Sequence, residues 1–103
     1  MTTRKLIPAR QSLEKLVGPL TFGMFMRVAR NTLEISQAEM AKRLKISPST
    51  LCDIEKERQL VSPKLALKVA RAAGLSETQA VRACLQDQVR RAGLTHQVQL
   101  IGA

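Results

Sequence analysis

The sequence predicts an all-α protein built from short helices. Apolar residues recur at helical spacing in successive segments of the chain. Almost every such segment follows a Ser or Thr suited to capping a helix, and in two cases a Pro comes next, as in Ser47-Pro48 and Ser62-Pro63. Hydrophobic residues make up 45% of the chain and aromatic residues only 2%, so we expect an ordered core that is aliphatic and rich in Met.

Length, charge and cysteine content narrow the class of protein. A chain of 103 residues suits one small domain with a single core. A formal charge of +9 favours a partner carrying many phosphates. The chain has neither an apolar run of about 18 residues nor a signal-peptide pattern, which predicts a cytoplasmic protein without a membrane partner. Cys52 and Cys84 lack metal-ligand spacing, so no metal and no cofactor are expected.

Residues 1–20 form an N-terminal extension in this interpretation. Residues 1–9 are expected to be extended, because Pro8 disfavours helix in the residue before it. Gln11 to Val17 has helical spacing and is followed by Gly18-Pro19, which predicts a short extra helix. That helix would pack on the domain or meet a second copy of the chain.

The next predicted helix starts after Thr21 and presents one apolar face. Residues at helical spacing on that face are expected in the core rather than in a cofactor pocket. Arg30 falls beside the same face, an unusual place for an unpaired charge. The apolar face consists of Phe22, Phe25, Met26, Ala29 and Leu33.

Two shorter helical patterns follow, separated by a tight break. Ser36 and Glu39 form a capping-box pattern before the first of them, which buries Met40, Ala41 and Leu44. Ser47-Pro48 starts the second, which buries Leu51 and Ile54 and leaves Ser49, Thr50, Asp53 and Lys56 outside. Two helices joined by so short a turn indicate a helix-turn-helix.

Two further helices and a tail complete the chain. Ser62-Pro63 starts a helix with Leu65, Val69 and Ala73 on its apolar face, and Gly74 ends it. Ser76 to Gln79 is a capping box for a last helix that reaches Arg91, with Ala80, Val81, Cys84 and Leu85 directed inward. Residues 94–101 partly alternate as a strand would, and a lone strand is unstable. They are expected to form a free tail or, alternatively, to pair with residues 4–7 of the same or a second chain.

The spaced positions resemble a known family. The runs Phe22-Gly23-x-x-Met26-Arg27-x-x-Arg30 and Ile35-Ser36-Gln37-x-Glu39-Met40-Ala41, continuing through Leu44, Ile46, Ser47, Ser49, Thr50, Leu51 and Ile54 to Glu55, are similar to the Cro/C1-type (XRE-like) helix-turn-helix domains. The resemblance covers about residues 21–85. It implies a five-helix, phage-repressor-like domain at residues 21–92, between an extension at residues 1–20 and a tail at residues 93–103.

The resemblance also implies which residues meet DNA. The helix at about residues 48–56 would lie in the major groove with base-facing residues Pro48, Ser49, Thr50, Cys52 and Asp53. The phosphate-contacting set would be Arg27, Ser36, Gln37, Ser47, Lys56 and Arg58. Arg30 and Glu55 would form a structural ion pair. Alternatively, Ser49 and Thr50 only cap the helix, and Gln37 is only a solvated helix start. Lys45 and Glu57 replace glycines that are common in the family.

The predicted function is a sequence-specific DNA-binding transcriptional regulator of bacterial or phage type that binds double-stranded DNA as a homodimer. The alternative is an antitoxin-like module that holds a toxin protein and also binds its operator. An enzyme is not expected, because His96 is the sole histidine and lies in the predicted tail.

Overall fold

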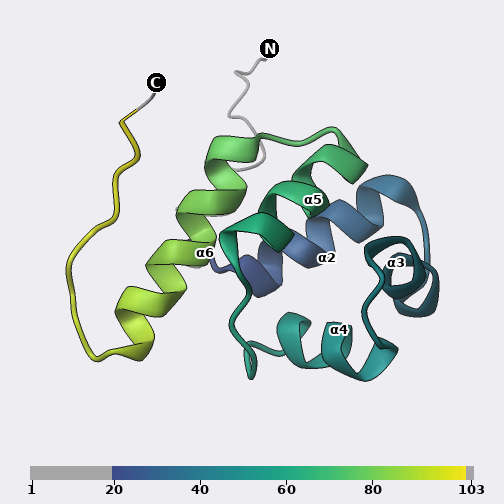
Figure 1. The fold of residues 1–103 in the computed structure, drawn as a ribbon, viewed down its shortest axis with the longest axis horizontal. Helices are drawn as coiled ribbons and strands as arrows, with labels where there is room; N and C mark the ends of the chain where they lie inside the picture. The colour runs from purple at the N-terminus through teal and green to yellow at the C-terminus, as the bar shows by residue number, and fades with distance from the viewer. Residues whose placement is uncertain (1–19, 102–103) are drawn as a thin grey trace, which may run out of the picture.

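The computed structural model describes residues 20–101, and these residues form five helices and no strand. The fold class is therefore all-α, as predicted (Figure 1). The extra helix expected at residues 11–17 and the possible pairing with residues 4–7 fall outside the described residues. The helices are α2 (Phe22–Leu33), α3 (Gln37–Leu44), α4 (Pro48–Glu55), α5 (Pro63–Ala73) and α6 (Glu77–Arg91).

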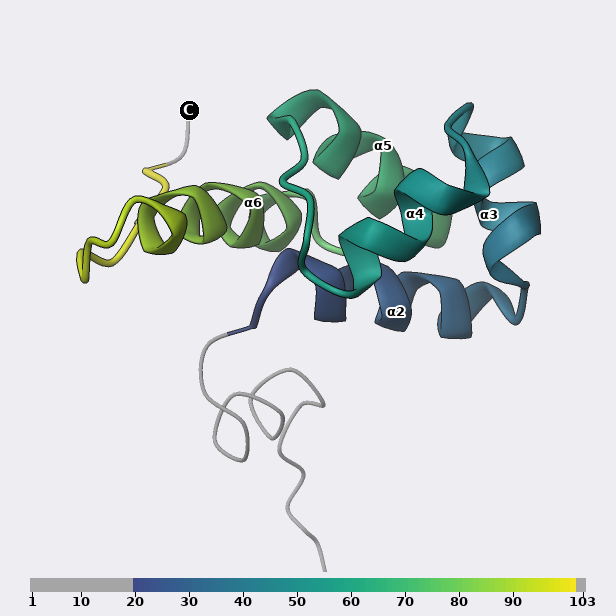
Figure 2. The same cartoon turned by 90° about the horizontal axis from the view of Figure 1, so that it is seen from below.

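The helices divide into a packed group and an outer pair. α5 packs along both α2 and α6, while α3 and α4 lie together at the end of the molecule away from α6. Seen from below, α4 lies nearest the viewer, and no other part of residues 20–101 crosses it (Figure 2). The tail after α6 runs at the opposite end, so it does not cover α4.

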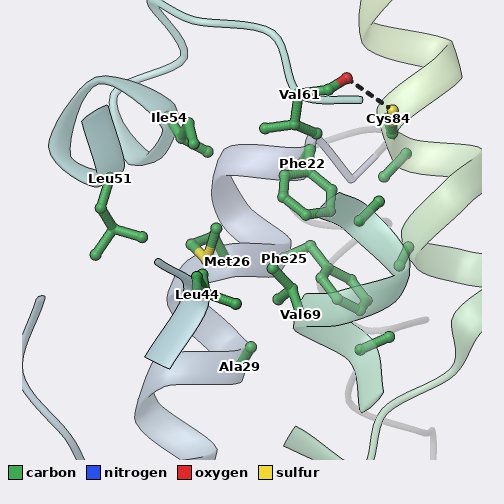
Figure 3. Close-up of a cluster of buried hydrophobic side chains, with 14 of the residues drawn as sticks. Phe22, Phe25, Met26, Ala29, Leu44, Leu51, Ile54, Val61, Val69 and Cys84 are labelled. Carbon is green, nitrogen blue, oxygen red and sulfur yellow. Dashed lines mark hydrogen bonds between the residues drawn. The ribbon is translucent and has the colours of Figure 1, made fainter. Parts of the chain in front are cut away.

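The core is aliphatic apart from two phenylalanines of α2. The rings of Phe22 and Phe25 stack with centroids 5.6 Å apart. Met26 and Ala29 follow one and two turns later and are fully buried. Around this face of α2 gather apolar residues from the other helices and from the loop before α5 (Figure 3), among them Leu44, Leu51, Ile54, Val61, Val69 and Cys84.

The faces that α5 and α6 bury differ from the predicted ones. Leu65 and Ala73 of α5 are only partly buried, and Ala66 and Ala70 take the central positions beside Val69. On α6, Ala83 is buried, whereas Val81 and Leu85 are only half-buried. Small residues allow two helices to approach closely, which explains why alanines rather than the larger side chains line this contact.

All five helices begin at the predicted capping residues. The hydroxyl of each N-cap residue accepts a hydrogen bond from the backbone N–H three residues later, as at Ser36 and Ser62. Each such cap typically stabilises a helix by about 1 kcal/mol. The caps are Thr21, Ser36, Ser47, Ser62 and Ser76.

Three residues other than glycine adopt the left-handed conformation at helix ends. Lys45 after α3 has φ 61° and Glu57 after α4 has φ 62°, so both positions do require the backbone shape that glycine adopts freely. Glu34, after α2, has φ 56°, which the sequence did not suggest. The strain at each position costs on the order of 1 kcal/mol.

The tail is attached to α6 by one glutamine. Gly93, with φ 81°, reverses the chain after α6, and the tail then runs back beside that helix (Figure 1). The side-chain amide of Gln86 donates to the carbonyl of His96 at 2.8 Å, and its oxygen accepts from the backbone N–H of Val98 at 2.8 Å. Residues 94–101 have no regular secondary structure.

Gly23 is required by the close approach of α2 to the end of α4. A Cβ at this position would lie 2.8 Å from the carbonyl oxygen of Ile54 and 2.9 Å from Cγ of Glu57. Gly23→Ala should therefore lower the free energy of unfolding by roughly 1–3 kcal/mol, measured by urea denaturation. In an unconstrained helix the same change is stabilising.

The matched control is the reverse change at an exposed helical position, Ala38→Gly, which should be destabilising through helix propensity alone. A Gly23→Ala variant as stable as the wild type, or more stable, would contradict this packing.

Candidate nucleic-acid interface

An ion pair joins α2 to α4 and extends to α3. Arg30 Nε donates to Glu55 Oε2 at 2.8 Å, and Arg30 Nη2 donates to Glu55 Oε1 at 3.2 Å. Gln37, the first residue of α3, donates its side-chain amide to the same Oε1 at 3.0 Å. Glu55 is 4% exposed and Arg30 is 21% exposed, so the carboxylate is almost completely removed from water. The hydrogen bond to Glu55 raises the pKa of Arg30 above its ordinary value.

Arg30 and Glu55 form the ion pair that the family resemblance implies. The hydrogen bond from Gln37 to Glu55 is not implied by that resemblance. The resemblance assigns Gln37 to the phosphates, whereas its amide nitrogen faces Glu55 in the structure. Arg30 Nη1 also donates to the carbonyl of Ile35, in the connection between α2 and α3, at 3.2 Å. Glu55 thereby fixes the relative positions of three helices.

The start of α4 is held by two hydroxyl groups. Ser47 Oγ accepts from the backbone N–H of Thr50 at 3.0 Å and donates to Thr50 Oγ1 at 2.8 Å. The cap of α4 is therefore Ser47, and the Thr50 hydroxyl contacts the capping hydroxyl rather than a backbone group of the helix. Pro48 and Ser49, by contrast, are exposed, and the hydroxyl of Ser49 makes no hydrogen bond with a described residue.

The outer side of α4 carries Cys52 and Asp53, both half-exposed. Asp53 Oδ1 lies 3.6 Å from Arg58 Nη1, and both side chains are well exposed to solvent. An exposed pair of this kind contributes about 0–1 kcal/mol. A ligand that offered Arg58 a phosphate would therefore break the pair at little cost.

The charges around α3 and α4 are nearly balanced. Residues 37–58 contain five Lys or Arg and four Asp or Glu, and one of those acids is the buried Glu55. Lys56 is exposed after α4, and Arg27 is exposed on α2; neither forms an ion pair within residues 20–101. Glu57 is directed toward the start of α2, where its carboxylate accepts from the hydroxyl of Thr21 at 3.0 Å.

Two further contacts hold α3 and α2 against the rest of the domain, and neither has a clear signal in the sequence. Lys68 of α5 donates to the carbonyl of Leu44, at the end of α3, at 2.9 Å. Asp87 of α6 accepts from the backbone N–H of Phe22, at the start of α2, at 2.9 Å, and also pairs with Arg90. Both join helices that are far apart in sequence, and local spacing does not reveal such contacts.

Comparison with known proteins places this geometry in a family. A helix-turn-helix family model matches residues 26–79, slightly more than half of the chain, and the match contains α3 and α4 completely. The chain belongs to the Cro/C1-type helix-turn-helix family. Membership of this family supports a DNA-binding helix-turn-helix regulator in general, and α3 and α4 are the two helices of the helix-turn-helix. The comparisons found no matching curated protein and no matching solved structure.

Within residues 20–101, His, Cys, Asp and Glu do not form a group of three that could hold a metal ion. No helix in the same range is long and apolar enough to span a membrane.

Removal of Glu55 tests the three-helix contact. Glu55→Ala leaves Arg30 and the amide of Gln37 without their shared partner. We expect it to lower the free energy of unfolding by about 2–4 kcal/mol, somewhat less than for a completely buried pair because Arg30 keeps some contact with water. Urea denaturation followed by circular dichroism measures the change.

Glu77→Ala is the matched control, since Glu77 pairs with Arg71 in solvent, 3.1 Å away. That variant should unfold like the wild type. Equal stability of the two variants would show that the contact at Glu55 does not hold the helices together.

Proposed function

We propose that this protein is a sequence-specific transcriptional regulator that inserts the start of α4 into the major groove of double-stranded DNA. The observation that carries the proposal is the fixed position of α4, whose first turn no other part of residues 20–101 covers. Its first turn is exposed, while Glu55 at its other end is tied to both α2 and α3. An eight-residue helix is unstable alone, so this attachment supplies the rigidity that base recognition requires.

The groove-facing set offers small polar groups rather than long side chains. Ser49 and Thr50 can each donate to or accept from a base edge, and Asp53 can accept from the amino group of cytosine. Pro48 and Cys52 are compact, which allows the helix backbone to come close to the floor of the groove. Such contacts predict preference for a few base pairs at each site, with Asp53 favouring a G·C pair.

Phosphate contacts would position the motif on the duplex. Ser36 and Gln37 lie at the start of α3, where backbone N–H groups without helical partners favour an anion. Ser47 has the same position at α4. Arg27, Lys56 and Arg58 supply charge, with Arg58 exchanging Asp53 for a phosphate.

We expect the protein to bind DNA as a dimer, because the part of α4 that would contact bases is small. One eight-residue helix contacts few base pairs, and two copies related by a two-fold axis would read two half-sites about one helical turn of DNA apart. Linking the two binding events raises both affinity and specificity.

Selection from a random-sequence duplex library, repeated over a range of salt concentrations, tests the proposal. We expect enrichment of a palindromic sequence and an affinity that falls steeply with salt. A steep salt dependence without enrichment would mean non-specific binding. Absence of both would overturn the proposal and favour the protein-interaction module.

A double variant tests the assigned residues. Gln37→Ala with Ser49→Ala should leave the protein folded and weaken binding to the selected duplex roughly tenfold or more. Fluorescence anisotropy at one fixed salt concentration measures the affinity, and circular dichroism checks the fold.

The control is Thr78→Ala, an exposed change on α6 far from the motif. It should bind DNA as the wild type does. Full affinity in the double variant would remove Gln37 and Ser49 from the DNA-binding site.

A further inference from the structure

α4 carries no positive charge, although it is the helix that the proposed function inserts between the phosphate backbones of DNA. Its eight residues include two acids, Asp53 and Glu55, and neither Lys nor Arg. The other described helices, α2, α3, α5 and α6, each contain at least two basic residues. A surface that faces DNA usually gains affinity from Lys and Arg. The composition of α4 therefore needs an explanation other than affinity.

Asp53 is the acid of α4 whose charge a duplex would meet. Glu55 is 4% exposed and bound by Arg30, so its charge is compensated within the protein. The Asp53 side chain is 40% exposed, and its only ion-pair partner within residues 20–101 is Arg58, which is 65% exposed. The backbone N–H of Arg58 donates to the carbonyl of Asp53 at 2.8 Å. This backbone contact keeps the guanidinium near the carboxylate while both remain open to solvent.

A carboxylate in the major groove is favoured by cytosine and disfavoured by the other bases. Cytosine presents its N4 amino group there as a hydrogen-bond donor. Guanine and thymine present acceptors, and adenine places its N7 acceptor beside its amino group. Acceptor atoms repel a carboxylate, and so do the phosphates on either side of the groove. Only the hydrogen bond from a cytosine offsets that repulsion.

We infer that Asp53 determines the specificity of this protein by repelling DNA that offers it no cytosine amino group, and that Arg58 neutralises this charge in the free protein. On any duplex, a phosphate attracts Arg58 and leaves Asp53 without its partner. At a cytosine, the carboxylate gains a charge-assisted hydrogen bond in exchange. At another base it gains none, so the exchange weakens binding. The inference rests on the proposed function, because it assigns a role within the same DNA-binding surface.

This role explains why basic residues are absent from α4. The formal charge of +9 attracts DNA of every sequence alike, which by itself gives affinity without discrimination. An acid on the surface that meets the bases lowers the affinity for the wrong duplex and leaves the right one bound. A Lys or Arg in the place of Asp53 would instead strengthen binding to phosphates of any sequence.

Asp53→Asn tests the inference, because it removes the charge and keeps the shape of the side chain. Fluorescence anisotropy at one salt concentration compares the duplex selected by the wild type with a scrambled duplex of equal length. Affinity for the scrambled duplex should rise roughly fivefold or more, since the repulsion is gone. Affinity for the selected duplex should fall, since the charge-assisted hydrogen bond is lost. The ratio of the two affinities should therefore drop roughly tenfold or more, and circular dichroism checks the fold.

Glu77→Gln is the matched control. Glu77 is an exposed acid that pairs with Arg71 at 3.1 Å, and it lies on α6, outside the helix-turn-helix. The change alters the net charge by the same amount as Asp53→Asn. It should therefore raise the affinity for both duplexes by the same factor and leave their ratio unchanged.

Two further measurements separate the roles of Asp53 and Arg58. Selection from the random-sequence library, repeated with Asp53→Asn, should lose the preference for a C·G pair at one position of each half-site and keep the other preferences. Arg58→Ala should weaken binding to both duplexes and lower the slope of log affinity against log salt concentration by about 1.

Equal affinity ratios for Asp53→Asn and Glu77→Gln, or an unchanged preference at every position in the repeated selection, would overturn the inference and leave the proposed function standing. An unchanged salt slope for Arg58→Ala would overturn the role of Arg58. If the wild type selects no duplex, the proposed function fails at that earlier step, and the inference fails with it.

Discussion

The contact of Glu55 with Arg30 and Gln37 holds the helix-turn-helix in place against α2. One nearly buried carboxylate accepts hydrogen bonds from α2 and from α3 while belonging to the last turn of α4. A charge in that position is tolerated only when it is fully paired, so the angle between the helices is set by the geometry of these bonds as well as by apolar packing. This contact therefore fixes the direction in which the exposed start of α4 points.

Other features of the domain also fix the positions and the ends of its helices. Caps at every helix start satisfy backbone groups, and alanine contacts bring α5 close to α6. The left-handed residues Lys45 and Glu57 lie at the end of α3 and just after α4, so both short helices end sharply despite some backbone strain. The excess positive charge lies mostly outside residues 37–58. Its main contribution would therefore be long-range attraction of the whole domain to DNA rather than direct contact.

Local features of the chain were predictable because their causes are local. Capping residues, the apolar face of α2, and the turn between α3 and α4 each depend on a few neighbouring residues. The burial of Ala66 and Ala83 in place of Leu65 and Leu85 was not predictable from periodicity, because it depends on which helix faces which. The ion pair of Arg30 came only from family resemblance, since its partner lies 25 residues away.

Several contacts of the site were not predictable from the sequence, because they too depend on which helices face each other. Three contacts each join residues from separate elements that meet only in the folded protein. Gln37 donates to Glu55, Asp87 accepts from the start of α2, and Gln86 binds the tail. The partly alternating pattern of the tail gave no sign that the side chain of Gln86 would bind it to α6, and residues 94–101 form no strand in the structure.

We propose that the start of α4, which is held by Glu55 and exposed to solvent, is the surface that enters the groove. Nuclear magnetic resonance of isotopically labelled protein, titrated with a selected duplex, tests it residue by residue. We expect the backbone amides of residues 36–39 and 47–53 to change most, while those of the tail remain nearly unchanged. The largest changes in α5 and α6, with α4 unaffected, would contradict it.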